Sequence, residues 1–278
     1  MRTLPYALLT ICTLSHASVG LPLEQKGAFL LLGGVSIAGH GPYRFLIDTG
    51  AESSVISPML AESLKLAPVY TVEVQSTVGT RLAPAYRLTA VSASGISTSG
   101  PCADAIEALS YPLTAVEKAV GPLDGILGQN FFHKFNFILD LQRRTLWMDP
   151  AGRVVGDRVA FTNSAGRLQI PVSLPSGNAV RNLILDSGAS HLVLFAPVKL
   201  DLPREAFLDT SSGSQKVTMG RLALLKIGGQ SWKRLPAASL PRPLTHTSDG
   251  LLPIHLFRSV YFNHTGGYVI FNPVFQPH

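Results

Sequence analysis

Phe45-Leu46-Ile47-Asp48-Thr49-Gly50-Ala51 is an apolar run that ends in Asp-Thr-Gly-Ala. A second run, Leu183-Ile184-Leu185-Asp186-Ser187-Gly188-Ala189, ends in Asp-Ser-Gly-Ala. An ionised carboxylate at the end of a buried strand is costly to remove from water. Because the sequence places one there twice, each followed by a hydroxyl residue and a glycine, we expect the two aspartates to form one functional pair.

The surroundings of the two aspartates repeat as well. A single Asp-Thr-Gly is most often a turn after a strand, because Asp caps its own backbone and Gly accepts positive φ. Here a strand, a turn and a second strand precede each aspartate, over residues 29–47 and 168–186. Downstream, the segment 123–132 has a counterpart in 248–257, and each is followed by a β-rich segment, 135–149 and 260–272. The chain therefore reads as an internal duplication of one β-rich unit.

The composition favours short strands and many turns. Of 278 residues, 46% are hydrophobic and 14% charged, with 25 Gly and 20 Pro. Helical periodicity predicts two short helices, at 58–65 and 113–120. The net charge is +6, but the basic residues are scattered, so we expect no nucleic-acid partner.

These repeated motifs resemble the pepsin/retropepsin superfamily of aspartic proteases. The resemblance is to a single-chain, two-lobed member of the bacterial retropepsin-like type, since an Ala follows each Asp-Thr/Ser-Gly. It implies an all-β bilobal acid-protease fold, two related lobes with short helices and the active site in the cleft between them. The family's bracing strand, which supports each catalytic loop, corresponds to Ile126-Leu127-Gly128 and Leu251-Leu252-Pro253.

Four segments are expected along the chain. Residues 1–17 carry a positive start, an apolar run too short to span a bilayer and a small-x-small cleavage pattern, which predict a signal peptide. Residues 18–150 form the N-terminal lobe, 151–166 the inter-lobe connection and 167–278 the C-terminal lobe. Cleavage leaves Cys102 as the one thiol, so we expect no intramolecular disulfide and read Cys102 as a packed or loop thiol. The expected location is a bacterial periplasm or the exterior, without stable membrane insertion, as a monomer.

The resemblance implies roles for the residues of both motifs. Asp48 and Asp186 would be catalytic and share one proton, because two adjacent carboxylates cannot both ionise comfortably; the pepsin dyad is a standard example of this effect. Thr49 and Ser187 would exchange hydroxyl–backbone hydrogen bonds across the lobe interface. Gly50 and Gly188 would permit tight turns whose N–H groups point at the carboxylates. No metal ligands and no cofactor are expected.

Each lobe should also carry a flap hairpin over the cleft. In the first lobe, residues 72–85 alternate around Val78, Gly79 and Thr80. In the second lobe, the turn 211–214, with Ser212 and Gly213, is the analogous tip. We expect these residues to contact substrate.

Two departures from the family pattern stand out. Pro253 replaces the bracing Gly, which removes a backbone N–H and leaves the packing beneath the second loop in question. Ala51 and Ala189 replace hydroxyl residues that pepsins use as donors to the carboxylates. Losing a donor raises the apparent pKa of the pair, so we expect an activity optimum less acidic than that of pepsin.

Two functions are compatible with these patterns. The first is an exported aspartic endopeptidase that hydrolyses peptide bonds in peptide or protein substrates with a water activated between the two aspartates. The second is a catalytically weak or inactive relative that binds extended peptides in the same cleft. Serine-hydrolase and zinc motifs do not occur in the sequence.

Overall fold

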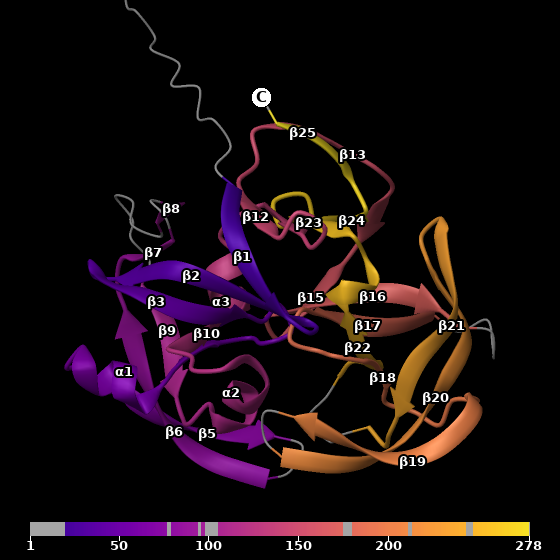
Figure 1. Ribbon diagram of the computed structural model, residues 1–278, viewed down its shortest axis with the longest axis horizontal. Coiled ribbons are helices and arrows are strands. Elements are labelled where there is room, and N and C mark those ends of the chain that lie inside the picture. Colours follow the sequence, from indigo (N-terminus) through magenta and orange to yellow (C-terminus); the bar gives the residue numbers. More distant parts are fainter. Residues whose placement is uncertain are drawn as a thin grey trace, which may run out of the picture.

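The computed structural model describes residues 20–76, 79–93, 96–97, 105–174, 180–210, 213–242 and 247–277. Within these ranges, strands dominate and the helices are short. The chain forms two β-rich lobes that lie side by side, with a group of strands joining them on one side (Figure 1). The predicted signal peptide and Cys102 lie outside the described residues. No helix in the described part of the chain is long and apolar enough to cross a membrane.

The first lobe is built from a sheet of short strands with three helices. The strand order β1-β2-β3-β10-β4-β9-β6-β5 runs from the centre of the molecule to its edge, with β7 paired to β2 and β8. The elements are β1 Gly20–Lys26, β2 Phe29–Ile37, β3 His40–Ile47, β4 Ser54–Ile56, α1 Pro58–Ser63, β5 Tyr70–Ser76, β6 Gly79–Leu88, β7 Val91–Ala93, β8 Ile96–Ser97, β9 Ile106–Ser110, α2 Thr114–Val120, β10 Gly125–Leu127 and α3 Gln129–Phe132.

The second lobe is a separate eight-stranded sheet in the order β15-β16-β17-β22-β18-β21-β20-β19. The edge of this sheet is formed by a long hairpin of β19 and β20, and the described residues of this lobe contain no α-helix. Its elements are β15 Thr162–Ser164, β16 Arg167–Ser173, β17 Val180–Asp186, β18 Leu192–Leu194, β19 Asp201–Thr210, β20 Gly213–Ile227, β21 Gln230–Ser239, β22 Gly250–Pro253 and the 3-10 helix η1 Ile254–Leu256.

Strands from both halves of the sequence form the junction between the lobes. They continue the first-lobe sheet beyond β1 in the order β12-β11-β23-β24-β14, with a small β13–β25 pair beside them. The strands are β11 Phe137–Asp140, β12 Thr145–Met148, β13 Gly152–Val155, β14 Arg158–Ala160, β23 Ser259–Asn263, β24 Tyr268–Phe271 and β25 Val274–Pro277. The segment 151–166, predicted as the connection, thus consists largely of the short strands β13, β14 and β15.

The predicted helices at 58–65 and 113–120 are confirmed as α1 and α2. Ser57 caps α1 by accepting a hydrogen bond from the Leu60 N–H, and Pro58 occupies the first turn, where its missing N–H costs nothing. Helix α3 was not predicted, because four residues are too few to show a period.

The internal duplication is visible in matched hydrogen bonds. The Asp124 carboxylate accepts from the Arg44 N–H at 2.7 Å, and the Asp249 carboxylate accepts from the Asn182 N–H at 2.9 Å. Arg44 and Asn182 each stand four residues before a motif aspartate. A continuous apolar core runs through both lobes and the junction strands, so the two catalytic loops are mounted on one packed body.

Candidate active site

Each motif aspartate stands at the end of a buried strand that pairs in parallel with a bracing strand. In the first lobe, β3 pairs with β10, with Ile47 opposite Leu127. In the second lobe, β17 pairs with β22, with Asp186 opposite Pro253. The β3 and β17 strands are buried at these ends, so each carboxyl group emerges from the core of its own lobe.

The structure brings the two aspartates face to face. A Cβ atom added to Gly50 would lie 2.4 Å from the Cγ of Asp186, and one added to Gly188 would lie 2.8 Å from the Cγ of Asp48. Each glycine therefore packs against the carboxyl group of the other lobe. Asp186 is buried and Asp48 is partly buried.

Thr49 and Ser187 bond the two loops to each other. The Thr49 N–H donates to Ser187 Oγ at 2.9 Å, and the Ser187 N–H donates to Thr49 Oγ1 at 3.1 Å. The two hydroxyl groups donate onward to the carbonyls of Leu185 and Ile47, at 2.8 and 2.7 Å. Both side chains are almost fully buried. The exchange predicted from the sequence is present, and it fixes the loops relative to each other with four buried bonds.

Backbone N–H groups also point at the carboxylates, as predicted. The Gly50 and Ala51 N–H groups both donate to Asp48 Oδ1 at 3.0 Å. The Gly188 N–H donates to Asp186 Oδ1 at 2.7 Å. These donors favour the ionised forms, but they do not offset burial.

Burial raises the pKa of both carboxyl groups. Burial and then the nearby charge of Asp48 hold the pKa of Asp186 well above its ordinary value. The pKa of Asp48 is also raised by burial, while the loop N–H groups, a hydrogen bond with Asp186 and the positive charge of Arg167 oppose the rise. The two carboxyl groups therefore titrate as one unit, and the pair retains a proton to higher pH than a solvent-exposed carboxyl group does.

A polar cluster supports the first loop from below. The Gly128 N–H donates to Ser54 Oγ at 3.0 Å, and Asn130 Oδ1 accepts from both the N–H and the hydroxyl of Ser54, at 2.9 and 2.7 Å. Gln129 donates to the Thr49 carbonyl at 2.9 Å. Sequence reasoning missed Ser54, Gln129 and Asn130, although Gln129 and Asn130 directly follow the recognised brace.

Pro253 does not disturb the second loop. It lies within β22, is buried, and has an extended backbone with φ −71° and ψ 135°. Leu192 stands six residues after Asp186, as Ser54 does after Asp48, and Pro253 is the third residue of its brace, as Gly128 is of the first. The donor and the acceptor of the first-lobe bond are thus both absent at these two positions of the second lobe, so the loss of one does not leave the other unpaired.

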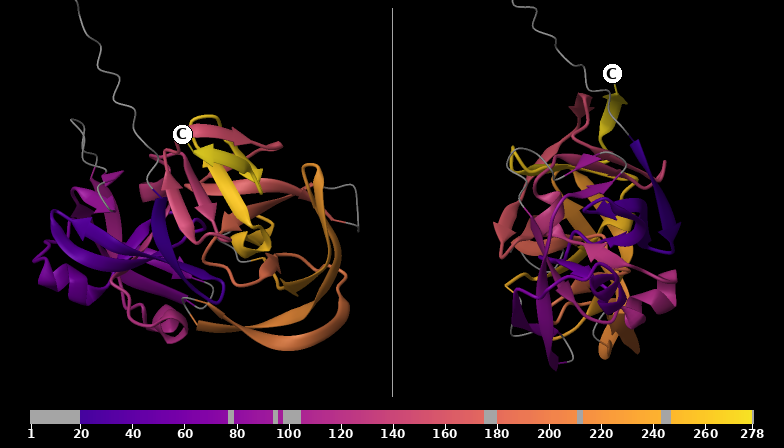
Figure 2. Two further views of the ribbon diagram at one scale, coloured as in Figure 1. Left: turned by 45° about the horizontal axis from the view of Figure 1, so that its top comes forward. Right: turned by 90° about the vertical axis from the view of Figure 1, so that its left-hand side faces the viewer.

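Both predicted flap regions form hairpins, and the paired ends of the two hairpins point toward each other from the two lobes (Figures 1 and 2). In the first, β5 and β6 pair from Tyr70–Ala85 to Ser76–Gly79. In the second, β19 and β20 close at Thr210–Gly213, and β19 contacts α2 of the first lobe. Gly79 and Thr80 belong to β6 and Gly213 to β20, whereas Val78 and Ser212 lie outside the described residues.

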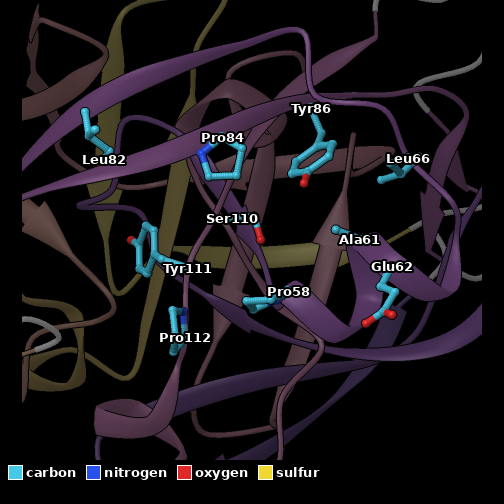
Figure 3. Close-up of a pocket in the computed structure, with 10 residues that line it drawn as sticks. All are labelled: Pro58, Ala61, Glu62, Leu66, Leu82, Pro84, Tyr86, Ser110, Tyr111 and Pro112. Atoms are coloured by element: carbon cyan, nitrogen blue, oxygen red, sulfur yellow. The ribbon is translucent and has the colours of Figure 1, made fainter.

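Two hollows flank the first catalytic loop. One, of about 320 Å³, is mainly apolar and lies between β6 and α1, as Figure 3 shows; Tyr86 and Pro84 of β6 and Tyr111 line it with Ala61 of α1. The other, of about 500 Å³, is lined mostly by polar residue types and joins both lobes, because Glu52 and Ser53 of the catalytic loop meet Asn163 and Gly166 there. Both are large enough to hold side chains of a bound peptide.

The described residues contain no cluster of three His, Cys, Asp or Glu side chains that could hold a metal ion. Besides the polar support, sequence reasoning missed two residues: Arg167, whose charge acts on Asp48 from β16, and His255, which lies beside Ala189 and His191 of the second loop. Arg167 carried no sequence signal, since it is distant from either motif along the chain.

Comparison with known proteins gives two findings. Residues 34–131 match the sequence model of the aspartyl protease family. Among solved structures, the chain is similar to a retropepsin-like aspartic protease from Rickettsia conorii, at 16% identity and a TM-score of 0.34, over 47% of this chain and 89% of that one. The search of curated proteins gave no match. The family match includes Asp48, its loop and the brace through Gly128.

Proposed function

We propose that this chain, a member of the retropepsin/pepsin-like aspartic protease superfamily, is an endopeptidase whose active site is formed by Asp48 and Asp186. The observation that carries the proposal is the mutual packing of the two loops, with each glycine against the opposite carboxyl group and four buried hydrogen bonds between them. A single motif could be a turn. Two motifs that are hydrogen-bonded to each other with their carboxyl groups facing do not need ionisable side chains for stability, so the two carboxyl groups point to catalysis.

The proposed reaction is hydrolysis without a covalent enzyme intermediate. The ionised aspartate of the pair removes a proton from a water molecule as the water oxygen attacks the peptide carbonyl carbon. The other aspartate, which holds the shared proton, donates it to the carbonyl oxygen. The tetrahedral diol then collapses as its C–N bond breaks. One aspartate gives its proton to the leaving nitrogen, and a diol hydroxyl gives its proton to the other aspartate as the product carbonyl forms, so the pair again holds one proton.

The two hairpins are proposed to enclose the peptide. An extended substrate can add backbone hydrogen bonds to strand edges, and β5 and β19 are the edge strands of their sheets. The polar hollow at Glu52 and the apolar hollow beneath β6 would receive substrate side chains. We further propose export through the signal peptide 1–17, a periplasmic or secreted location, and action as a monomer, since both aspartates come from one chain.

The alternative function is binding of an extended peptide without cleavage. It draws support from the departures at Ala51, Ala189 and Pro253. The second lobe lacks counterparts of both Ser54 and Gly128, so Pro253 leaves no hydrogen-bond acceptor without its donor. This weakens the argument from Pro253.

The test is cleavage of a denatured protein substrate by the purified mature chain between pH 3 and 8, beside the variants Asp48→Asn and Asp186→Asn. We expect wild-type cleavage that a statine-type transition-state mimic inhibits, and loss of at least a thousandfold in either variant. His40→Gln, at an exposed position in β3, is the matched control and should retain full activity. Peptide binding without cleavage at every pH would favour the alternative, and cleavage that persists in both variants would refute the site.

A further inference from the structure

The larger of the two hollows lies where the lobes meet, next to the first catalytic loop. Glu52 stands four residues after Asp48 and forms part of its wall. A Cβ atom added to Gly166 of the second lobe would lie 2.8 Å from the Cγ of Glu52, so this turn packs directly against the Glu52 side chain. The Glu52 carbonyl accepts a hydrogen bond from the Asn130 N–H at 3.1 Å. Both lobes therefore hold Glu52 in place at the edge of the hollow.

The Glu52 carboxylate has no partner among the residues that the structure describes. It takes part in none of the ion pairs there, and its oxygens accept no hydrogen bond. Arg167 adjoins the packed turn in sequence but forms no ion pair with Glu52. Lys134 also lines the hollow and already has an interaction of its own. Glu107, a second carboxylate in the wall, contacts the hydroxyl of Tyr70. The hollow thus contains a negative charge that no described cation pairs.

The uncharged polar groups of the wall add hydrogen-bond acceptors. Gln129 lines the hollow and is almost fully buried. Its Nε2 donates to the Thr49 carbonyl at 2.9 Å, while its Oε1 has no partner within the described part of the chain. The Nδ1 of His133 lies 2.8 Å from the Gln129 carbonyl. Because a carbonyl only accepts, Nδ1 carries the hydrogen, and Nε2 of the neutral ring is an acceptor. A buried acceptor without a donor is costly, so an occupant that donates hydrogen bonds is favoured.

We propose that this hollow is a subsite for a basic side chain of the substrate, arginine in preference to lysine, and that Glu52 selects it. The inference rests on the proposed function, since it names the class of substrate for the same cleft. A guanidinium group has five N–H donors and no acceptor, which matches a wall that offers a carboxylate, an amide oxygen and an imidazole nitrogen. A lysine ammonium group would pair with the carboxylate only as a point charge. The hollow, of about 500 Å³, has room for either side chain.

The first test compares peptides that differ in charge at one position. Arginine or citrulline, its uncharged isostere, is placed in turn at each position around the scissile bond of a peptide that the wild type cleaves. We expect kcat/KM to be about tenfold higher for arginine at one position, as one charge-assisted pair would give. Glu52→Gln should abolish this preference and leave kcat/KM for the citrulline peptide within about threefold of wild type, and Glu52→Lys should favour glutamate at the same position. Glu24→Gln, the same change at an exposed site on β1 outside both hollows, should keep the preference for arginine.

A binding measurement separates this inference from the proposed function. Its probes are statine-centred peptides, which are not cleaved at the statine, with arginine or citrulline at each position. We expect the wild type to bind one arginine probe about tenfold more tightly than its citrulline partner, and Glu52→Gln to bind both equally. If the wild type shows this difference but cleaves no peptide, the proposed function fails while the subsite stands.

Three outcomes would overturn the inference. One is equal use of arginine and citrulline at every position, in cleavage and in binding. Another is a preference for arginine that survives in Glu52→Gln, which would assign the selection to other residues. The third is an equal loss of kcat/KM for both peptides in Glu52→Gln, which would give Glu52 a structural role in the catalytic loop.

Discussion

At the scale of single residues, Gly50 and Gly188 set how closely the two carboxyl groups approach. A Cβ atom at Gly50 would lie 2.6 and 2.7 Å from the two oxygens of Asp186, so the loops would have to separate to admit it. Because displacement of a reacting group by about 1 Å can cost a hundredfold in rate, we expect Gly50→Ala to lower kcat/KM by about that factor or more. Gly33→Ala, at a position with no heavy atom within 4 Å of the added Cβ, is the matched control. Equal rates for the two variants would contradict the close packing.

Ala51 makes a second prediction at this scale. Its backbone N–H donates to Asp48 at 3.0 Å, but its methyl side chain offers no further donor. We expect Ala51→Ser to add a donor that stabilises the ionised pair, which lowers its apparent pKa and moves the acidic limb of the pH–rate profile to lower pH. The measurement is kcat/KM against pH for wild type and variant. An acidic limb that does not move would show that the serine hydroxyl does not reach the carboxylate.

The residues that could be predicted from the sequence are those within the repeated motifs. Asp48-Thr49 and Asp186-Ser187 are two copies of one motif, and the contacts between the copies follow from the family resemblance that the motif carries. Arg167 and His255 could not be predicted, because their effects depend on charge and hydrogen bonding between segments that are brought together only by folding. The roles of Ser54 and Leu192 could not be predicted either, because they depend on whether the facing brace residue, Gly128 or Pro253, has a backbone N–H.

At the scale of elements, the two lobes share a catalytic loop, a brace and a hairpin but differ in what surrounds them. The alternation of apolar residues predicted the first hairpin and the turn at 211–214 predicted the second, and the structure adds that β19 contacts α2 of the other lobe. Sequence patterns describe one strand at a time and do not show which distant element it will contact. The helix α1 after the first loop has no counterpart among the described residues between 195 and 200, where the chain is irregular.

The brace strands allow a direct test of the paired replacement. Pro253→Gly restores a buried N–H but gives it no acceptor, so we expect a loss of roughly 2 kcal/mol in the free energy of unfolding, from chain entropy and from the unpaired N–H together. Leu192→Ser removes a buried apolar side chain and should cost about 2–4 kcal/mol. In the double variant the first-lobe hydrogen bond can form, so the total loss should be smaller than the sum by about 1 kcal/mol. Urea unfolding of the wild type, the two single variants and the double variant measures this coupling. Strictly additive losses would mean that the serine and the glycine introduced at these two positions do not form the bond that Ser54 and Gly128 form in the first lobe.

At the scale of the whole molecule, the junction strands hold the lobes in register. Strands β11 and β23, from different halves of the sequence, pair from Phe137–Phe262 to Asp140–Ser259. The rings of Phe137 and Phe262 stack with centroids 4.4 Å apart. The sequence predicted two β-rich segments here but not that they pair, because the duplication does not specify how its two copies associate. The relative position of Asp48 and Asp186 therefore depends on the stability of this junction.

His264 makes the junction sensitive to acid. Its ring lies 5.9 Å from the Phe137 ring and 5.8 Å from the Phe161 ring, and its Nε2 is buried without a partner. Burial, with a smaller effect of His133, lowers the pKa of His264 to about 4. A histidine whose pKa is lower in the folded than in the unfolded chain stabilises the fold fully above the unfolded value, about 6.5, and this contribution is lost as pH falls towards 4. We expect up to about 3 kcal/mol of stability to disappear over that window.

In His264→Phe the loss between pH 6.5 and 4 should be smaller by that amount, while His40→Gln should behave as wild type. Chemical unfolding at several pH values measures the difference. An identical pH dependence in wild type and His264→Phe would mean that other groups control the acid stability of the junction.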